Sequence, residues 1–541
     1  MNSLEFKHFR KFENFRKISF NDITFLVGKN NSGKSTFVKA YMLILNYLKS
    51  DNLKSIDFNQ GTVETLNIVT FDRALCKTMT NKAQKENISF TLQINDFEFS
   101  LTVTGKQDNT EADVLFLSIT DQSSGFTLKI SPKSNEVIIE YHSQEHIVSQ
   151  NDILLNLHLE KAKIIKALEK LEDNLSTDSI ELNSQLQKIN KNIEMLLKDQ
   201  ESIESSFVVS TSYSGNTLKT LFKDINLDIT NKYKIQYPEE FKKINIESEV
   251  DNDDDEFLNI DSSEPFENNI EKLEIQEEFE DLRYFYINRF SFQKFSDKLL
   301  NFLQNIEVVY LSATLNKQAA LFSIREKNNP VAMSVFQYHQ LELKEDPIIN
   351  AFINKWFKIF QIGEAISINM VEGEAFAVNI ISGDSIIPLA DKGMGSIQAA
   401  LLILRIASVI YKKKKEEKRE LVADKDVRNQ ISEIIIIIEE PELNLHPALQ
   451  SKLCDLFFEV HEKYNVKFII ETHSEYVIRK TQLFVKQESL EVAPNENPFA
   501  VLYFNDDLNA WNMEYREDGK FKNDFGSGFF DETRNIVKQM L

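Results

Sequence analysis

A glycine-containing loop between an apolar strand and a helix is the feature that most constrains how this chain folds. Residues 20–36 read FNDITFLVGKNNSGKST, and the helical run FVKAYMLILNYLK follows them directly. We expect a strand over 23–27, a loop of the pattern G-x-x-x-x-G-K-S and then a helix, which is the context that a phosphate-binding loop requires. The 541 residues include only 14 glycines, so a chance match to this pattern is rare. The loop therefore predicts nucleotide binding.

Each residue type in the loop has a chemical reason to be there. Glycines let the backbone turn so that N–H groups face phosphate oxygens, and the N-terminus of the following helix adds partial positive charge. Lys34 would reach the β- and γ-phosphates of ATP, and the Ser35 hydroxyl would ligate Mg2+. The expected nucleotide-binding residues of the loop are Gly28, Asn30, Asn31, Ser32, Gly33, Lys34, Ser35 and Thr36.

A second apolar strand ends in paired carboxylates. Residues 434–447 read IIIIIEEPELNLHP. The isoleucines are typical of a strand covered on both faces, whereas buried glutamates are costly unless a positive group lies opposite them. A phosphate-binding loop beside this strand supplies that group. Glu439 would orient the Mg2+ shell and Glu440 would polarise the attacking water, with a solvated strand end as the alternative.

Two further motifs carry candidate site residues. Residues 466–480 read VKFIIETHSEYVIRK, and His473 at the end of this short strand could hydrogen-bond a γ-phosphate or serve a structural role. Residues 389–398 read LADKGMGSIQ and precede the helical run AALLILRIASVIY. Gly393, Gly395 and Ser396 would offer backbone N–H groups and a hydroxyl to an anion at a helix start. The alternative is a helix-capping turn without a ligand.

Composition limits the class of protein. A hydrophobic content of 42% with 41 Phe predicts a folded globular chain long enough for several domains. The net charge of −22 argues against a generally basic nucleic-acid coat. Two cysteines fit a reducing compartment, the N-terminus lacks the apolar core of a secretory signal, and the apolar runs look too short or interrupted to span a bilayer. We therefore expect a soluble cytoplasmic protein without a membrane partner.

The spacing of apolar residues changes several times in the region between the motifs. Apolar and polar residues alternate over 86–145, which predicts an antiparallel meander with one solvent-exposed face. Residues 157–203 show a 3–4 spacing with a break at 174–179, which fits either a short antiparallel helical hairpin or a packed helical subdomain. The acidic tract 251–281 is typical of a solvated linker, with docking of a basic partner as the alternative.

A basic tract lies before the isoleucine strand, and the changes in pattern along the chain indicate domain limits. The run YKKKKEEKRE at 411–420 fits a polar insertion that is either a solvated loop or a contact for nucleic-acid phosphates. Four segments are expected: an N-terminal head lobe at 1–150, a helical hairpin at 151–210, a mixed and acidic insertion at 211–300, and a C-terminal head lobe at 301–541.

Together these motifs resemble the ATP-binding-cassette ATPase heads of the RecF and structural-maintenance-of-chromosomes kind. The resemblance implies an α/β P-loop head with a mixed β-sheet, helices on both faces and an antiparallel β-lobe, here with an inserted helical hairpin. It also implies that two heads sandwich ATP and Mg2+, each contributing the GMGS turn to its partner's nucleotide. Such heads carry a Q-loop, for which Gln60 in DFNQGTVE is the candidate.

The segments LADKGMGSIQ, IEEPELNLHP, ETHSE and GFFDE further resemble stand-alone ATPase subunits of bacterial anti-phage systems of the Septu type. That resemblance implies a homo-oligomeric ATPase that holds and regulates a separate nuclease or toxin. An intrinsic nuclease is not expected, because Asp506 and Asp507 are adjacent and would point to opposite faces of a strand. Alternatives are a DNA-repair ATPase that binds DNA, and an ATP-clamped scaffold with little hydrolysis.

Overall fold

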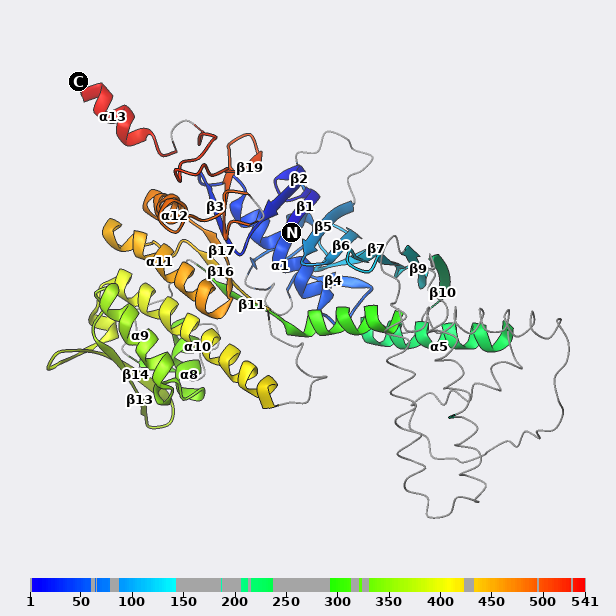
Figure 1. The fold of residues 1–541 in the computed structure, drawn as a ribbon, viewed down its shortest axis with the longest axis horizontal. Coiled ribbons are helices and arrows are strands. Elements are labelled where there is room, and N and C mark those ends of the chain that lie inside the picture. The colour runs from blue at the N-terminus through cyan, green and yellow to red at the C-terminus, as the bar shows by residue number, and fades with distance from the viewer. Residues whose placement is uncertain are drawn as a thin grey trace, which may run out of the picture. The chain divides into compact units, whose positions relative to one another are not determined.

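The computed structural model describes most of both ends of the chain. The described residues are 2–59, 64, 66–77, 87–142, 186, 206–212, 216–236, 292–312, 321–323, 330–422, 433–493, 496–526 and 529–540. The chain divides into unit 1, which comprises Met1–Leu115 and Asn301–Leu541, and unit 2, Phe116–Leu300 (Figure 1). Most of the expected helical hairpin, the acidic tract and Gln60 lie outside the described residues. The four-segment division expected from the sequence stays a prediction.

A six-stranded sheet forms the centre of unit 1, in the order β11-β16-β17-β3-β18-β19. The first five strands are parallel and β19 is antiparallel to β18. The strands are β11 (Ile306–Leu311), β16 (Glu433–Glu439), β17 (Lys467–Glu471), β3 (Ile23–Gly28), β18 (Phe499–Phe504) and β19 (Ala510–Asn512). Ile434–Ile438 are at most 3% exposed, which confirms the buried strand. The strand that ends in the paired glutamates is thus separated from the loop strand by β17.

Helices cover both faces of this sheet. They are α1 (Lys34–Leu48), α11 (Pro447–Tyr464) and α12 (Glu475–Gln487). Phe499 and Phe504 lie five positions apart on β18, so their side chains point to opposite faces. The Phe499 ring contacts Phe458 of α11 and Phe484 of α12, at 5.5 and 6.0 Å between centroids. The Phe504 ring contacts Phe37 of α1 at 6.3 Å. This arrangement confirms the expected α/β head with helices on both faces.

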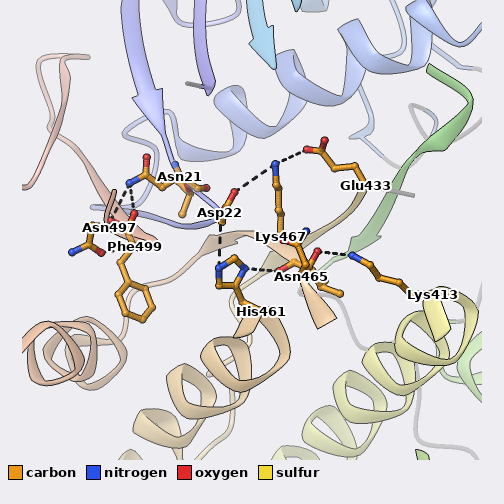
Figure 2. A network of polar contacts seen from close by, with 11 residues as sticks. Asn21, Asp22, Lys413, Glu433, His461, Asn465, Lys467, Asn497 and Phe499 are labelled. Carbon is orange, nitrogen blue, oxygen red and sulfur yellow. Dashed lines mark hydrogen bonds and ion pairs between the residues drawn. The ribbon is translucent and has the colours of Figure 1, made fainter. Parts of the chain in front are cut away.

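Polar side chains tie the N-terminal ends of the parallel strands together (Figure 2). Lys467 at the start of β17 lies 2.7 Å from Glu433 of β16 and 3.5 Å from Asp22, which precedes β3. Asn21 donates a hydrogen bond of 2.7 Å to the carbonyl of Asn497, just before β18. These contacts hold the N-terminal ends of the strands level with one another. The C-terminal ends of the strands therefore lie together at the opposite edge of the sheet.

An antiparallel sheet lies on the other side of α1 in unit 1. Helix α1 contacts strands of both sheets, namely β1 and β5 here and β3 and β17 in the parallel sheet. The strands of unit 1 on this side are β1 (Asn2–Phe9), β2 (Phe12–Phe20), β4 (Ser55–Asp57), β5 (Asn87–Ile94), β6 (Phe97–Thr104) and the first half of β7 (Glu111–Asp121). A short helix, α2 (Phe71–Ala74), precedes β5. Strand β1 pairs with both β2 and β5, and β5 pairs with β6.

Unit 2 contains part of the antiparallel meander expected from the alternating sequence. Its strands pair in chain order from the second half of β7 through β8 (Phe126–Ser131), β9 (Glu136–His142) and β10 (Ser206–Ser212). It also contains α5 (Leu218–Gln236) and a helical stretch from residue 292. The rings of Phe126 and Phe295 stack at 5.0 Å, and Lys298 pairs with the buried carboxylate of Asp121 at 3.0 Å.

A third, four-stranded sheet belongs to unit 1 and pairs β14 with β12, β13 and β15. These strands are β12 (Leu321–Ser323), β13 (Ala365–Val371), β14 (Ala375–Ser382) and β15 (Ser385–Pro388). The neighbouring helices are α8 (Pro330–Gln340), η3 (Leu343–Glu345), α9 (Pro347–Ile359), η4 (Leu389–Asp391) and α10 (Met394–Val422), and the described chain ends with α13 (Glu532–Met540). Asp346 caps α9 by accepting hydrogen bonds from the N–H groups of Ile348 and Ile349.

Helix α10 corrects two expectations from the sequence. The run 411–420 is not a loop insertion but the C-terminal part of this helix, where Lys413 donates to the Asn465 carbonyl and Lys414 pairs with Asp346. The segment Met394–Glu417 is also long and apolar enough to cross a membrane, contrary to the expectation from its shorter apolar run. Of an 18-residue apolar window in this segment, 72% is buried inside the structure, as is typical of a core helix.

Candidate active site

Two glycines shape the loop between β3 and α1. Gly28 has a φ of 147° and Gly33 a φ of 113°, values that other residues rarely adopt. A Cβ on Gly28 would lie 2.2 Å from the Phe504 carbonyl oxygen, and one on Gly33 would lie 2.4 Å from the ring of Phe12. Strands β18 and β2 therefore pack directly against the loop. Both positions require glycine for conformation and for space.

Lys34 lies inside the loop and is only 3% exposed. Its Nζ donates to the carbonyls of Gly28 and Lys29, each at 3.0 Å, and lies 3.7 Å from the Glu471 carboxylate. Burial lowers the pKa of this ammonium group, while Glu471 opposes that shift. The Ser32 hydroxyl is buried and has no hydrogen-bond partner among the described residues. A buried cation and a free hydroxyl inside a glycine-bounded loop fit an anionic ligand.

Glu471 is a site residue that the sequence interpretation missed. It ends β17, between the loop strand and the strand of the paired glutamates, in register with Leu26 and Glu439. Its carboxylate accepts a hydrogen bond from the Ser35 hydroxyl, at 2.9 Å to Oε2. Burial raises its pKa to about 7, and the charges of Glu439 and Glu440 add to that rise against Lys34 and Ser35. The segment ETHS placed it two residues before His473, but its contact with Ser35 depends on the strand order.

Glu439 lies in the neighbouring strand, beside Glu471. Its side chain is hydrogen-bonded to Tyr310 of β11, a contact that adds to the effect of burial in raising the pKa of the tyrosine. Among the described residues, no group of three or more His, Cys, Asp or Glu side chains forms a metal site. Ser35, Glu471 and Glu439 nevertheless supply the hard oxygen ligands that Mg2+ prefers when phosphate oxygens complete its shell. The residues present therefore fit an Mg2+–nucleotide complex.

Glu440 and His473 face each other at the open side of the site. The His473 Nε2 atom lies 3.7 Å from the Glu440 Oε1 atom, and each side chain is 31% exposed. Burial and the charge of Lys34 lower the pKa of His473 to about 4, so the imidazole is neutral at pH 7. Glu440 has a left-handed φ of 44°, and its N–H donates to the Glu471 carbonyl at 2.7 Å. The structure thus brings together the two residues that the sequence selected from separate motifs.

Glu442 is a second residue that the sequence interpretation did not select. Its Oε1 atom accepts a hydrogen bond of 2.6 Å from the backbone N–H of His473, while Oε2 is buried without a partner among the described residues. Burial raises the pKa of this carboxyl group. Glu442 therefore fixes the backbone of His473 relative to the segment that carries Glu440.

The GMGS turn lies against the Glu440 segment of its own chain. Helix α10 begins at Met394, so Ser396 lies within its first turn, and the Ser396 N–H donates to the Gly393 carbonyl at 2.9 Å. A Cβ on Gly395 would lie 2.3 Å from the Asn444 carbonyl oxygen, whereas one on Gly393 would have no atom within 4 Å. Glycine at position 395 is needed for close packing within the chain, whereas the space beside Gly393 is unoccupied.

A basic pocket of about 570 Å³ lies beside the loop. Its lining residues are Arg10, Lys11, Asn30, Asn31, Arg73, Leu75, Lys77, Asp506 and Leu508. The Arg10 Nη1 atom is buried without a partner among the described residues. Burial, followed by the charge of Arg10, lowers the pKa of nearby Lys39 to about 8. The sequence interpretation missed these cations, because they come from the β1–β2 turn and the segment 73–77.

Comparison with known proteins places the chain. Among solved structures, similar ones include the Smc head domain from Pyrococcus furiosus with an extended coiled coil, bound to the C-terminal domain of ScpA (12% identity, 100% of both chains covered, TM-score 0.32). Another is the SMC head domain from Thermotoga maritima (9% identity, 95% of this chain and 98% of that chain covered, TM-score 0.30). No curated protein matches the sequence. The model of a family described as the AAA ATPase domain matches residues 1–478, and the chain belongs to that family.

Proposed function

We propose that this chain is a Mg2+-dependent ATP hydrolase of the RecF and SMC type. The proposal rests on the contacts of Glu471 with Lys34 and Ser35, and on the pair formed by Glu440 and His473 next to it. Both groups lie at the C-terminal ends of adjacent parallel strands. Ligands of open parallel sheets bind at this edge. An AAA ATPase domain binds nucleotide, and these side chains supply the groups that phosphoryl transfer needs.

Each residue has a role that follows from its position. Lys34 turns from the loop carbonyls toward the β- and γ-phosphates, and the loop N–H groups and the Ser32 hydroxyl hold the remaining oxygens. The Glu440 carboxylate accepts a proton from, and orients, the attacking water. Neutral His473 can donate a hydrogen bond to the γ-phosphate from one ring nitrogen.

Ser35, Glu471 and Glu439 would hold the metal ion. Bound Mg2+ would neutralise charge that develops on the β- and γ-phosphate oxygens. Glu471 already accepts a hydrogen bond from Ser35, so the two oxygen atoms are positioned on one side of the loop. The basic pocket beside the loop would take the remaining part of the nucleotide, with Arg10 donating to an anionic or acceptor group.

We further infer that hydrolysis occurs between two copies of the head, in a cytoplasmic homo-oligomer. The open Gly393 and the N–H groups at the start of α10 form an anion-binding end that could complete a partner's site. The resemblance of LADKGMGSIQ, IEEPELNLHP, ETHSE and GFFDE to Septu-type subunits supports a role in anti-phage defence. In that role the ATPase would regulate a separate nuclease or toxin.

The decisive experiment compares the wild type with Glu440→Gln in ATP turnover and in mass photometry, with and without ATP and Mg2+. We expect the variant to lose hydrolysis and to accumulate an even-numbered assembly with ATP. Glu462→Gln, which changes an exposed glutamate of α11, is the matched control and should behave as wild type. A variant that hydrolyses ATP normally would refute Glu440 as the base. A mass that stays monomeric in every condition would refute the two-head arrangement.

A second experiment tests whether DNA cleavage is carried out by this chain or by a separate partner protein. The purified chain is incubated with plasmid DNA and Mg2+ or Mn2+, with and without ATP. We expect no cleavage, because the proposed function supplies the cutting activity in a separate protein. Metal-dependent cleavage by the purified chain would overturn this part of the proposal. Stimulation of ATP turnover by DNA would instead favour a DNA-repair ATPase.

A further inference from the structure

The backbone of Glu440 is held in an uncommon conformation by contacts from two sides. Its φ of 44° lies in the left-handed region, which is unfavourable for residues other than glycine. On one side, its N–H donates to the Glu471 carbonyl at 2.7 Å. On the other, its carbonyl accepts from the Leu443 N–H and from the Gln398 side chain, each at 3.1 Å. Contacts of this kind are needed to maintain a strained backbone.

Gln398 belongs to α10, two residues after the GMGS sequence. Its Nε2 atom makes the hydrogen bond to Glu440, while its Oε1 atom is buried without a partner among the described residues. Leaving a buried amide oxygen unsatisfied is unfavourable, so general stability is a poor explanation for glutamine at this position. Gly395 in the preceding turn lies against the Asn444 carbonyl, which keeps α10 in close contact with the same segment.

We propose that Gln398 is a positioning residue that holds the Glu440 backbone and couples the GMGS turn to water activation in the same chain. The inference rests on the proposed function, in which Glu440 is the base and the GMGS turn contacts a nucleotide. Among the described residues, the hydrogen bond of Gln398 goes to the main-chain carbonyl of Glu440 and not to a group of the phosphate-binding loop. A movement of the first turn of α10 is therefore transmitted directly to the Glu440 backbone, whereas the phosphate-binding loop is held by its own packing against Phe504 and Phe12.

The kinetic test uses Gln398→Met, which keeps the side-chain length and removes the donor. Because misplacement of a catalytic group by about 1 Å can lower a rate by about 100-fold, we expect kcat to fall by about 10- to 100-fold. KM and the Kd for a fluorescent ATP analogue should stay within about twofold of wild type, because binding depends on the loop. Gln487→Met, at an exposed position of α12, is the matched control. An unchanged kcat would overturn the proposal.

Gln398→Glu gives a readout that a structural role would not produce. When ionised, this glutamate has no proton to donate to the Glu440 carbonyl; when protonated, its O–H can donate. The kcat of Gln398→Glu relative to wild type should therefore rise as the pH falls from 8.5 to 5.5, while that of Gln398→Met stays flat. A flat ratio for both variants, or a loss of activity that follows a lower thermal unfolding midpoint, would contradict the proposal.

Hydrogen exchange separates this inference from the proposed function. In Gln398→Met, amides of the segment 440–445 should exchange faster than in wild type, and those of the loop 28–36 should exchange at the same rate. Unchanged exchange in 440–445 would overturn the positioning role. If the wild type binds ATP without hydrolysing it, the proposed function fails, and the exchange result still decides whether Gln398 holds this segment.

Discussion

The carboxylate of Glu471 and the hydroxyl of Ser35 lie 2.9 Å apart, between the strand end of β17 and the first turn of α1. The same carboxylate lies 3.7 Å from the Lys34 ammonium group. Before nucleotide binds, Glu471 therefore contacts both Lys34, which would bind phosphate, and Ser35, which would bind the metal ion. A phosphate group that binds Lys34 therefore competes with Glu471 for the lysine.

Glu471→Gln should separate nucleotide binding from its dependence on Mg2+. Removing the negative charge should strengthen ATP binding in EDTA, because Lys34 loses its competing partner, and should weaken the enhancement that Mg2+ gives. We expect each effect to be about tenfold, or about 1.4 kcal/mol. Titration of a fluorescent ATP analogue with and without Mg2+ measures both, with Glu462→Gln as the control. Equal affinities for wild type and variant in EDTA would contradict the competition between Glu471 and phosphate for Lys34.

The two glycines of the GMGS turn should respond differently to alanine. Gly395→Ala places a Cβ 2.3 Å from a backbone oxygen of Asn444, so the protein should lose about 1–3 kcal/mol of stability. Gly393→Ala meets open space and should leave the thermal unfolding midpoint unchanged. In the Glu440→Gln background, Gly393→Ala should weaken ATP-dependent association if this turn contacts a partner's nucleotide. Equal unfolding midpoints for the two alanine variants would show that the packing at Gly395 is wrong.

Glu442 offers a test of a buried carboxyl group. Glu442→Gln keeps an oxygen that can accept the His473 N–H, and burial already favours the neutral form of the carboxyl group. We expect this variant to unfold at nearly the wild-type temperature. Glu442→Leu leaves the N–H unsatisfied and should cost about 1–3 kcal/mol. Thermal unfolding of both variants measures the difference, and a larger loss for glutamine than for leucine would contradict this role.

Lys39 predicts a specific dependence of stability on pH. Burial and Arg10 lower its pKa to about 8 in the folded chain, below the ordinary value of 10.5. Between these two values the unfolded chain binds more protons, so the contribution of Lys39 to stability becomes more favourable as the pH rises. The unfolding midpoint of wild type relative to Lys39→Met should therefore increase from pH 7.5 to pH 9.5. Lys54→Met, at an exposed lysine, should show no such trend.

Local spacing was enough to predict much of this fold and site. The loop 28–36, the isoleucine strand and the segment ending in His473 each combine a short apolar run with polar residues at its end. In parallel strands such ends meet at one edge, so Lys34, Glu440 and His473 could be selected without knowing the strand order. The alternation over 86–145 likewise predicted the antiparallel meander.

Contacts between distant segments could not be predicted in this way. Glu471 reaches Ser35 only because β17 lies between β16 and β3, an order that no local pattern encodes. Arg10 enters the basic pocket from a turn, and Gly395 is constrained by Asn444 about fifty positions later. The run 411–420 was misread because its charge suggested a loop, whereas lysines and glutamates are also good helix formers.

The position of β18 has a consequence for the order in which the protein matures during synthesis. This strand, Phe499–Phe504, forms one wall of a loop that begins at Gly28, and Asp506 just beyond it pairs with Lys29 at 2.8 Å. A ribosome translates the loop long before it translates β18, because hundreds of residues lie between them in the sequence. A nascent chain that ends before residue 499 therefore has the complete phosphate-binding sequence without the enclosure around it. ATP capture should therefore begin only after β18 has left the ribosome and paired with β3.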